Sequence, residues 1–283
     1  MRLLRLVLAF FMVSAAGYAA PINMMSNDIV VPGAGRVAGA VGSFWVTDLW
    51  VRSPGGGTVT LEFHAMDSAS AQAAATAVIP MTSSMVFLPD VLRNTFGLET
   101  GLGNIRVIST NPASATIRVY DEAGGGATFG MSFMGMPSSM AMGAFSGMTG
   151  GDRDSYRYMI AGLLPEPRAR VNVMVVNTSA SPISGTVEVL DADDGDPGSG
   201  PRSLRFSIQP YSSHQFVGVL ENVQSRFPAG AGLQVRVQLD DGSTGSMMAL
   251  ATIMDNVSND PYVVVGSMMD GSSSMMNGGM GPH

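Results

Sequence analysis

Methionine is the residue whose type and spacing in this chain most directly suggest chemistry. The 283 residues include 23 methionines, which gather in a Gly/Ser-rich stretch at 124–151 and again near the C-terminus. Thioether sulfur is a soft ligand that suits Cu(I) or Ag(I) and binds Zn(II) or Ca(II) poorly. Spacings such as M-x-x-M and M-x-M on a pliable segment could wrap such an ion. The candidate metal ligands are Met131, Met134, Met136, Met140 and Met142 in the first cluster, and Met275, Met276, Met280 and His283 in the second.

Two other interpretations of these methionines stay open. The side chains could fill apolar positions in a weakly packed linker and tail, with no metal involved. They could also serve as sacrificial sulfur, because exposed methionine readily forms the sulfoxide. Cu(I) is the one cofactor that the sequence suggests, and packing and oxidation are the alternatives to it.

Four carboxylates lie close together in the second part of the chain, at Asp191, Asp193, Asp194 and Asp196. Hard oxygen ligands of this kind suit Ca²⁺. The spacing departs from a D-x-D-x-D-G loop, because Gly195 occupies the third ligand position and no glutamate follows at bidentate distance. A solvated hairpin turn is therefore favoured over a calcium site.

Catalytic motifs are absent from the sequence. The chain has no cysteine and only three histidines, His64, His214 and His283, so a Ser-His-Asp triad would need one of the first two. Neither G-x-S-x-G nor H-E-x-x-H occurs. His64 falls on the polar face of an alternating stretch, which predicts a surface histidine, and turn hydrogen bonding accounts for His214. The sequence predicts a protein that is not an enzyme.

Composition and the N-terminus limit location and partners. The net charge is -7, the charged fraction is 13% and there is no lysine, so nucleic acid and anionic lipid are not expected as partners. Residues 1–19 combine Arg2 and Arg5 with a short apolar run and a Gly17-Tyr18-Ala19 cleavage signal. This pattern is typical of a secretory signal peptide. No later stretch is apolar enough to cross a membrane, which predicts a periplasmic or extracellular protein.

Short alternating stretches separated by turn residues dominate the rest of the chain. At 58–66, for example, Val59, Leu61 and Phe63 alternate with polar residues, as expected for a half-buried strand. Short strands are expected also at 45–51, 76–80, 85–88, 105–108 and 115–120, and one short helix at 89–96. No stretch has the length and period of a long amphipathic helix.

The order of these elements repeats after the first methionine cluster. Val235-Arg236-Val237 matches Ile105-Arg106-Val107, 186–190 matches 58–62, and Met254-Asp255 matches Tyr120-Asp121. Two copies of about 100 residues, each with short strands and regular turns, are typical of tandem β-sandwiches. We expect an all-β chain with sandwiches at 29–123 and 156–266, a flexible Met/Gly-rich linker at 124–155 and a disordered tail at 267–283. A single large jelly roll is the alternative.

The residues GRVAGAVGSFWVTDLWVRSP, VTLEF, LPDVLRNTFGL, GNIRVIST and IRVYDEAGGGATFG resemble a family of bacterial secreted immunoglobulin-like modules. Such modules occur in tandem, often appended to exported hydrolases and cell-surface proteins. The resemblance covers most of residues 33–133 and, more loosely, 156–266. It implies fold and location rather than activity, and the methionine-rich linker departs from the family pattern.

The function expected from these observations is that of an exported, non-enzymatic binding or structural module of the cell envelope or extracellular space. Its partner would be an envelope or extracellular protein or a glycan. A periplasmic Cu(I)/Ag(I)-binding protein is the second hypothesis, and an accessory domain pair of a secreted hydrolase system is the third.

Overall fold

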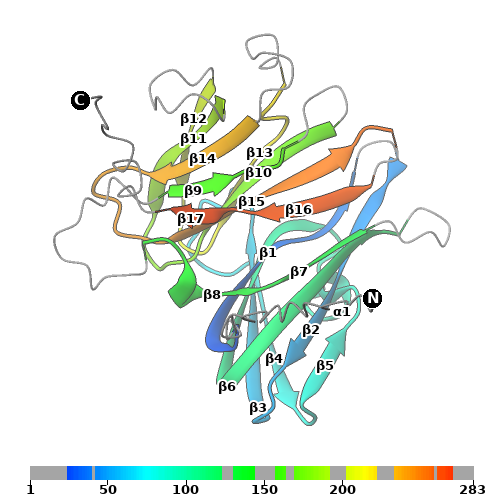
Figure 1. Cartoon of the computed structure of the whole chain (residues 1–283). Helices are drawn as coiled ribbons and strands as arrows, with labels where there is room; N and C mark the ends of the chain where they lie inside the picture. The colour runs from blue at the N-terminus through cyan, green and yellow to red at the C-terminus, as the bar shows by residue number, and fades with distance from the viewer. Residues whose placement is uncertain are drawn as a thin grey trace, which may run out of the picture.

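The computed structural model describes residues 24–39, 42–122, 130–143, 157–163, 169–191, 202–221, 233–257 and 260–269. These residues form antiparallel strands with one short helix and short 3-10 turns, so the all-β prediction is confirmed (Figure 1). The predicted signal peptide, 1–19, lies outside the described residues. Among the described residues, no helix is both long and apolar enough to cross a membrane.

The first half of the chain contains eight strands. They are β1 (Ser26–Ala38), β2 (Phe44–Arg52), β3 (Gly57–Ala65), β4 (Ala75–Met81), β5 (Met85–Leu88), β6 (Gly101–Asp121), β7 (Gly130–Met134) and β8 (Met136–Pro137), with α1 (Val91–Asn94) after β5 and the 3-10 turn η2 (Ser138–Met140) after β8. One layer runs in the order β4-β3-β6-β1-β8, and the other runs β5-β2-β6-β7.

Strand β6 belongs to both layers. Up to Ser109 it pairs with β1 and β3, and Ala113 still pairs with Ser26 of β1. From Ser114 it pairs with β2, and from Thr116 also with β7. The change coincides with Pro112, which has no N–H to donate to a ladder. The sequence predicted two separate strands at 105–108 and 115–120. The structure instead has one long strand that bends between the layers.

The second half repeats this organisation with separate strands. They are β9 (Arg157–Ile160), β10 (Ala169–Asn177), β11 (Ile183–Asp191), β12 (Arg202–Ile208), β13 (Ser213–Phe216), β14 (Leu233–Leu239), β15 (Met247–Asp255), β16 (Pro261–Val265) and β17 (Ser267–Met269). One layer has the order β12-β11-β14-β9-β17 and the other β13-β10-β15-β16. Each strand of the second half therefore takes the place of a first-half strand, with β14 and β15 replacing the two parts of β6.

The strand register corrects one of the matches drawn from the sequence. Arg106 lies opposite Glu62, and Arg236 lies opposite Glu188. Glu188 is thus the counterpart of Glu62, and 186–190 corresponds to 60–64 rather than to 58–62. A shift of two residues keeps every side chain on the same face of the strand, so the alternation in the sequence could not detect it.

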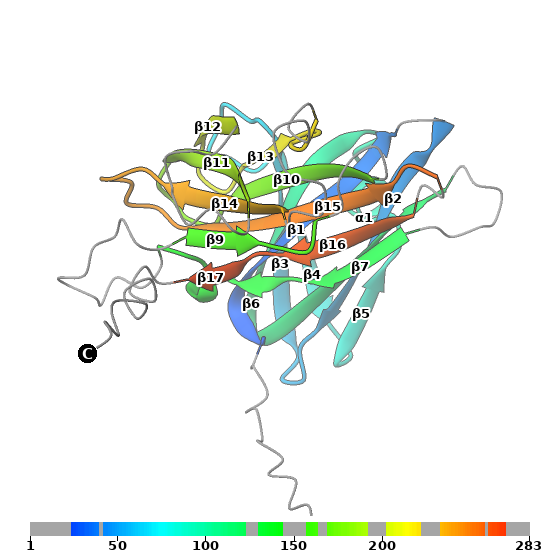
Figure 2. The same ribbon diagram turned by 45° about the horizontal axis from the view of Figure 1, so that its top comes forward.

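Each half has its own hydrophobic core. The core of the first half includes Ile29, Leu49, Phe63, Ile105 and Ile117, and that of the second half is built around β10, β11, β14 and β15. The second core also takes in two residues from the first part of the chain, Val30 and Met142. The two halves therefore pack against each other directly, and β7 lies beside β16 in two views (Figures 1 and 2).

The prediction of a flexible linker at 124–155 is wrong for its central part. Residues 130–142 form β7, β8 and η2, and Met142 bridges to Met247 of β15. The predicted disordered tail at 267–283 likewise begins with β17, which pairs with β9. The remaining residues of both segments lie outside the described residues.

Close packing explains one glycine of this segment that suggested flexibility in the sequence. Gly135 lies between β7 and β8, and a Cβ there would come within 2.6 Å of the Ile29 side chain on β1. Because only a residue without a side chain can approach β1 so closely, this glycine supports tight packing instead of a flexible linker.

We expect Met142→Ala to lower the free energy of unfolding by about 2–5 kcal/mol, because the side chain is 1% exposed and its removal leaves a cavity. Met142→Leu conserves volume and should cost less than about 1.5 kcal/mol. Met134→Ala is the matched control, since Met134 is exposed and its loss should change stability by no more than about 0.5 kcal/mol. Urea unfolding measures all three, and equal losses at positions 142 and 134 would contradict the packing role.

Candidate functional site

The two halves meet at a polar contact between the end of β3 and the turn before β13. Asp67 N donates to Ser213 O at 2.8 Å, and Ser212 Oγ donates to Ala65 O at 2.8 Å. From the first half, Asn104 Nδ2 donates to Tyr211 O at 2.5 Å. We call this contact the joint and define it as 64–68, Asn104 and Arg106 of the first half with 211–214 of the second.

The ring of Tyr211 lies at the centre of the joint. The Cζ atom of Arg106 is 4.2 Å from the centroid of this ring, and the His64 ring centroid is 5.4 Å away. Arg106 is itself held by Asp28 through two hydrogen bonds of 2.9 Å and by Glu62 at 3.4 Å. A desolvated guanidinium over an aromatic face is a favourable arrangement, so the charge network of the first half directly stabilises the position of the second.

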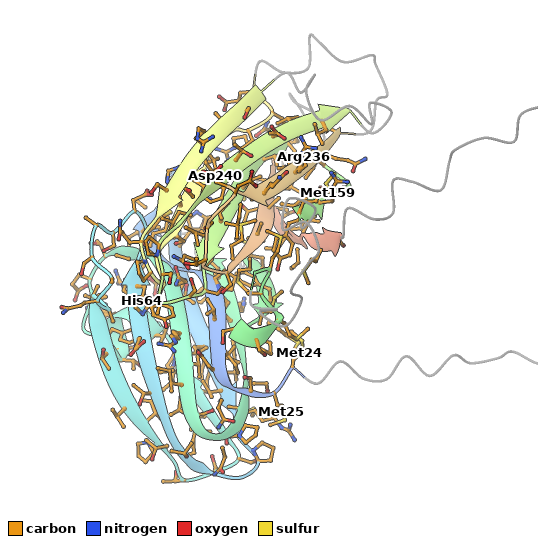
Figure 3. All side chains as sticks on the ribbon, turned by 90° about the vertical axis from the view of Figure 1, so that its left-hand side faces the viewer. Met24, Met25, His64, Met159, Arg236 and Asp240 are labelled. Carbon is orange, nitrogen blue, oxygen red and sulfur yellow. The ribbon has the colours of Figure 1, made fainter. Side chains whose placement is uncertain are left out.

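His64 is buried at the joint and is not the surface histidine that the sequence predicted. It does lie on the polar face of β3, but the second half covers that face and leaves the side chain 3% exposed (Figure 3). Its Nε2 is 3.4 Å from Glu62 Oε2, and its Nδ1 has no hydrogen-bond partner among the described residues. Burial lowers the pKa of His64 below 6.5, with Glu62 opposing the shift and Arg106 adding to it.

His214 is the second histidine at the joint. Its Nδ1 is 2.5 Å from Asp67 Oδ1, and its ring packs edge-on against Phe216. The sequence placed it at the start of a strand and explained it by turn hydrogen bonding. It does lie near the start of β13, but its ring pairs with a residue almost 150 positions earlier. Long-range contacts of this kind leave no trace in local sequence.

A cleft of about 260 Å³ opens between the two halves, away from the joint. Its first wall comes from the first half and is mostly apolar. This wall consists of Gly33, Gly35, Val37, Gly39, Ser43, Trp45, Leu102, Val119, Met131 and Phe133. Gly33 has φ +74° at a bulge of β1, and a Cβ there would lie 3.2 Å from Phe133. The glycines therefore keep this wall open.

The second wall is the outer face of the β13-β10-β15 sheet. It consists of Arg170, Asn172, Met174, Gln215, Val217, Leu250, Thr252 and Met254. The polar pair Asn172–Thr252 lies between the apolar pair Met174–Leu250 and the pair Arg170–Met254. A ligand would meet apolar surface on both walls and, on the second wall, the polar pair Asn172–Thr252 with Arg170 and Gln215 beside it. Apolar walls with a few polar groups are the usual design of a small-molecule site.

The size of the cleft limits what could fill it. Sites for drug-sized ligands measure roughly 300–1,000 Å³, so a space of about 260 Å³ suits a smaller molecule or a single large side chain. Methionines are well suited to such a wall, because their unbranched side chains adapt to irregular shapes.

The structure disperses the first predicted set of methionine ligands. Met131 pairs with Val119 and packs towards the first core, whereas Met134 pairs with Thr116 on the opposite face of the sheet and is exposed. Residues at odd spacing on a strand point to opposite faces, so these two thioethers do not converge. Met142 is enclosed in the second core.

The other candidate ligands have different surroundings. Met136 pairs with Val30 and packs against the second core, and Met140 ends η2. Met275, Met276, Met280 and His283 lie outside the described residues, as do Asp193, Asp194 and Asp196 of the acidic loop. Asp191 ends β11. Within the described ranges, no group of three or more His, Asp or Glu is arranged to hold a metal ion.

The cleft and the joint were both missed by sequence reasoning. Trp45 was interpreted there only as the start of a strand and as part of the family resemblance, and of the β1 glycines Gly35 alone fell within the residues quoted for that resemblance. The single available signal was the concentration of glycine at 33–42 next to an aromatic strand. Comparison of the chain with protein-family models, with curated proteins and with solved structures finds no match in any of the three.

We predict that acid weakens the fold through His64. An unfolded histidine titrates near 6.5 and the folded one below it, so the unfolded state binds more protons in the interval between the two pKa values. The stabilisation is therefore complete above 6.5 and is lost as pH falls through the folded pKa. Unfolding free energies measured from about pH 7.5 to about pH 5 should decline, and His64→Gln should flatten that decline.

His214→Gln is the matched control, because it removes the other histidine of the joint and leaves His64 in place. This variant should keep the decline below pH 6.5. A His64→Gln curve that runs parallel to the wild-type curve would show that His64 does not cause the acid sensitivity.

Proposed function

We propose that this chain is an exported, non-enzymatic binding protein made of two tandem immunoglobulin-like β-sandwiches. Its ligand site is the cleft between them, and the ligand is a small, predominantly apolar molecule with one hydrogen-bonding group. The observation that carries this proposal is the cleft itself, an apolar space lined by both halves and marked by the polar pair Asn172–Thr252. Sites of this composition are common where two domains meet.

The equal strand order of the two halves supports a tandem pair of one module. The layer β4-β3-β6-β1-β8 of the first half corresponds strand by strand to β12-β11-β14-β9-β17 of the second. The layer β5-β2-β6-β7 corresponds in the same way to β13-β10-β15-β16. Separate cores on either side of the joint are what two sandwiches require. The immunoglobulin-like assignment rests on the sequence resemblance and on this two-layer order.

Rigid placement of the halves supports binding at their boundary. The joint combines five hydrogen bonds between the halves with the Tyr211–Arg106 contact. A cleft whose walls are held apart by such contacts needs little rearrangement to accept a ligand, and preformed sites lose less free energy to ordering.

The other two functions stay as predictions. Copper binding through Met275, Met276, Met280 and His283 is independent of the cleft. Service as an accessory pair in a secreted hydrolase system is compatible with a binding cleft, since the cleft would then recognise a component of that system. Export itself follows from the signal pattern at 1–19.

The cleft can be tested with the neutral fluorescent probe N-phenyl-1-naphthylamine. We expect saturable binding with quenching of Trp45, which lines the cleft. The chain has two tryptophans, so the measurement is made in a Trp50→Phe background. Val217→Phe should weaken binding by roughly tenfold or more, because a bulky ring at this exposed lining position occupies the space and costs the ligand its apolar contacts.

Val257→Phe is the control, since Val257 is also exposed but does not line the cleft. This variant should bind the probe as the parent protein does. Binding that is unsaturable, or equally affected by both substitutions, would rule out the cleft as the site.

A further inference from the structure

An apolar row crosses the outer face of the β5-β2-β6-β7 sheet in the first half. Phe87, Trp50, Thr116 and Met134 pair with one another in register from β5 to β7. Phe87 is 48% exposed and Met134 is 51% exposed. The rings of Trp50 and Phe87 stack with centroids 4.7 Å apart. We call these four residues the Trp50 face.

The second half has the same row at equivalent positions, and there its two central residues are covered, whereas Val265 at its edge is 50% exposed. Gln215, Met174, Leu250 and Val265 pair in the same register on β13, β10, β15 and β16. Met174 and Leu250 are buried, and both face the first half across the cleft. In the second half this sheet face is therefore the surface on which a neighbouring module docks.

The contact between the halves is head-to-tail. The first half contributes its β4-β3-β6-β1 face and the glycine-rich bulge of β1, whereas the second contributes the turn before β13 and the β13-β10-β15 face. Contacts between unlike surfaces leave one copy of each surface unused, and they can repeat from molecule to molecule. The unused counterpart of the β13-β10-β15 face is the Trp50 face, and it is the more apolar of the two.

We propose that the Trp50 face binds the second half of another copy of this chain, which extends the head-to-tail order into a chain of molecules. A second copy is favoured because the equivalent β13-β10-β15 face of the second half already lies against a neighbouring half of the same fold. A glycan fits this surface less well. Sugars stack on open ring faces, whereas Trp50 and Phe87 turn a face towards each other at an interplanar angle of 24°.

The test is sedimentation velocity of the purified protein at concentrations up to about 500 µM, a range that covers weak interfaces. The mass of the wild-type protein should rise with concentration beyond that of two copies. Phe87→Asp and Met134→Asp should each weaken association by roughly tenfold or more, because each puts a charge at one end of the apolar row that the contact would bury. Both positions are about half exposed, so the fold should survive, and Phe87→Ser is the milder variant if Phe87→Asp fails to fold.

Val78→Asp is the matched control. Val78 is 63% exposed on β4, outside the Trp50 face, and this variant should associate as the wild type does. A protein that stays monomeric throughout, a mass that stops at two copies, or association unchanged by Phe87→Asp and Met134→Asp would each overturn the proposal. Capture of a glycan or another envelope protein by a monomer, abolished by the same substitutions, would overturn it as well.

Discussion

The contact of Tyr211 with Arg106 and His64 determines how the two halves sit, and the cleft depends on it. Tyr211 has φ +58° and Asp67 has φ +55°, a backbone region that costs a residue other than glycine on the order of 1–3 kcal/mol. Both residues lie in the joint. Their strain is offset by the Asn104 hydrogen bond to Tyr211, by the Asp67–His214 pair and by the guanidinium beneath the ring. Such over-determined geometry fixes one relative position of the halves.

The charge network that supports this contact has a counterpart in the second half. Glu188 accepts a hydrogen bond of 2.8 Å from Arg236 Nε, in the same cross-strand register as Glu62 and Arg106. The pair on β3 and β6 lies under Tyr211, and its guanidinium is engaged by both Asp28 and the ring. The Glu–Arg pair therefore links two strands of one sheet in the second half, whereas in the first half its arginine also contacts the other half through Tyr211.

The sequence predicted the strands well, because alternation is a local property. Val59, Leu61 and Phe63 are buried as their two-residue period required, and the repeated order of elements was visible before the structure. The site was not predictable in the same way. Burial of His64 depends on a turn almost 150 residues later, and glycines at 33–39 carry the cleft only once Phe133 packs beside them. Glycine and methionine at 130–142 suggested looseness because their packing partners, Ile29 and Met247, are distant in sequence.

The position of Met142 has a consequence for dividing the molecule. The obvious place to cut it into independent pieces is between Gly143 and β9. Met142 would then stay with the N-terminal piece, although its side chain packs in the core of the second half. A C-terminal fragment would lack this core side chain, and the N-terminal fragment would expose Met142 without the residues that it packs against. Refolding such fragments together, as in fragment complementation, would restore what neither piece holds alone.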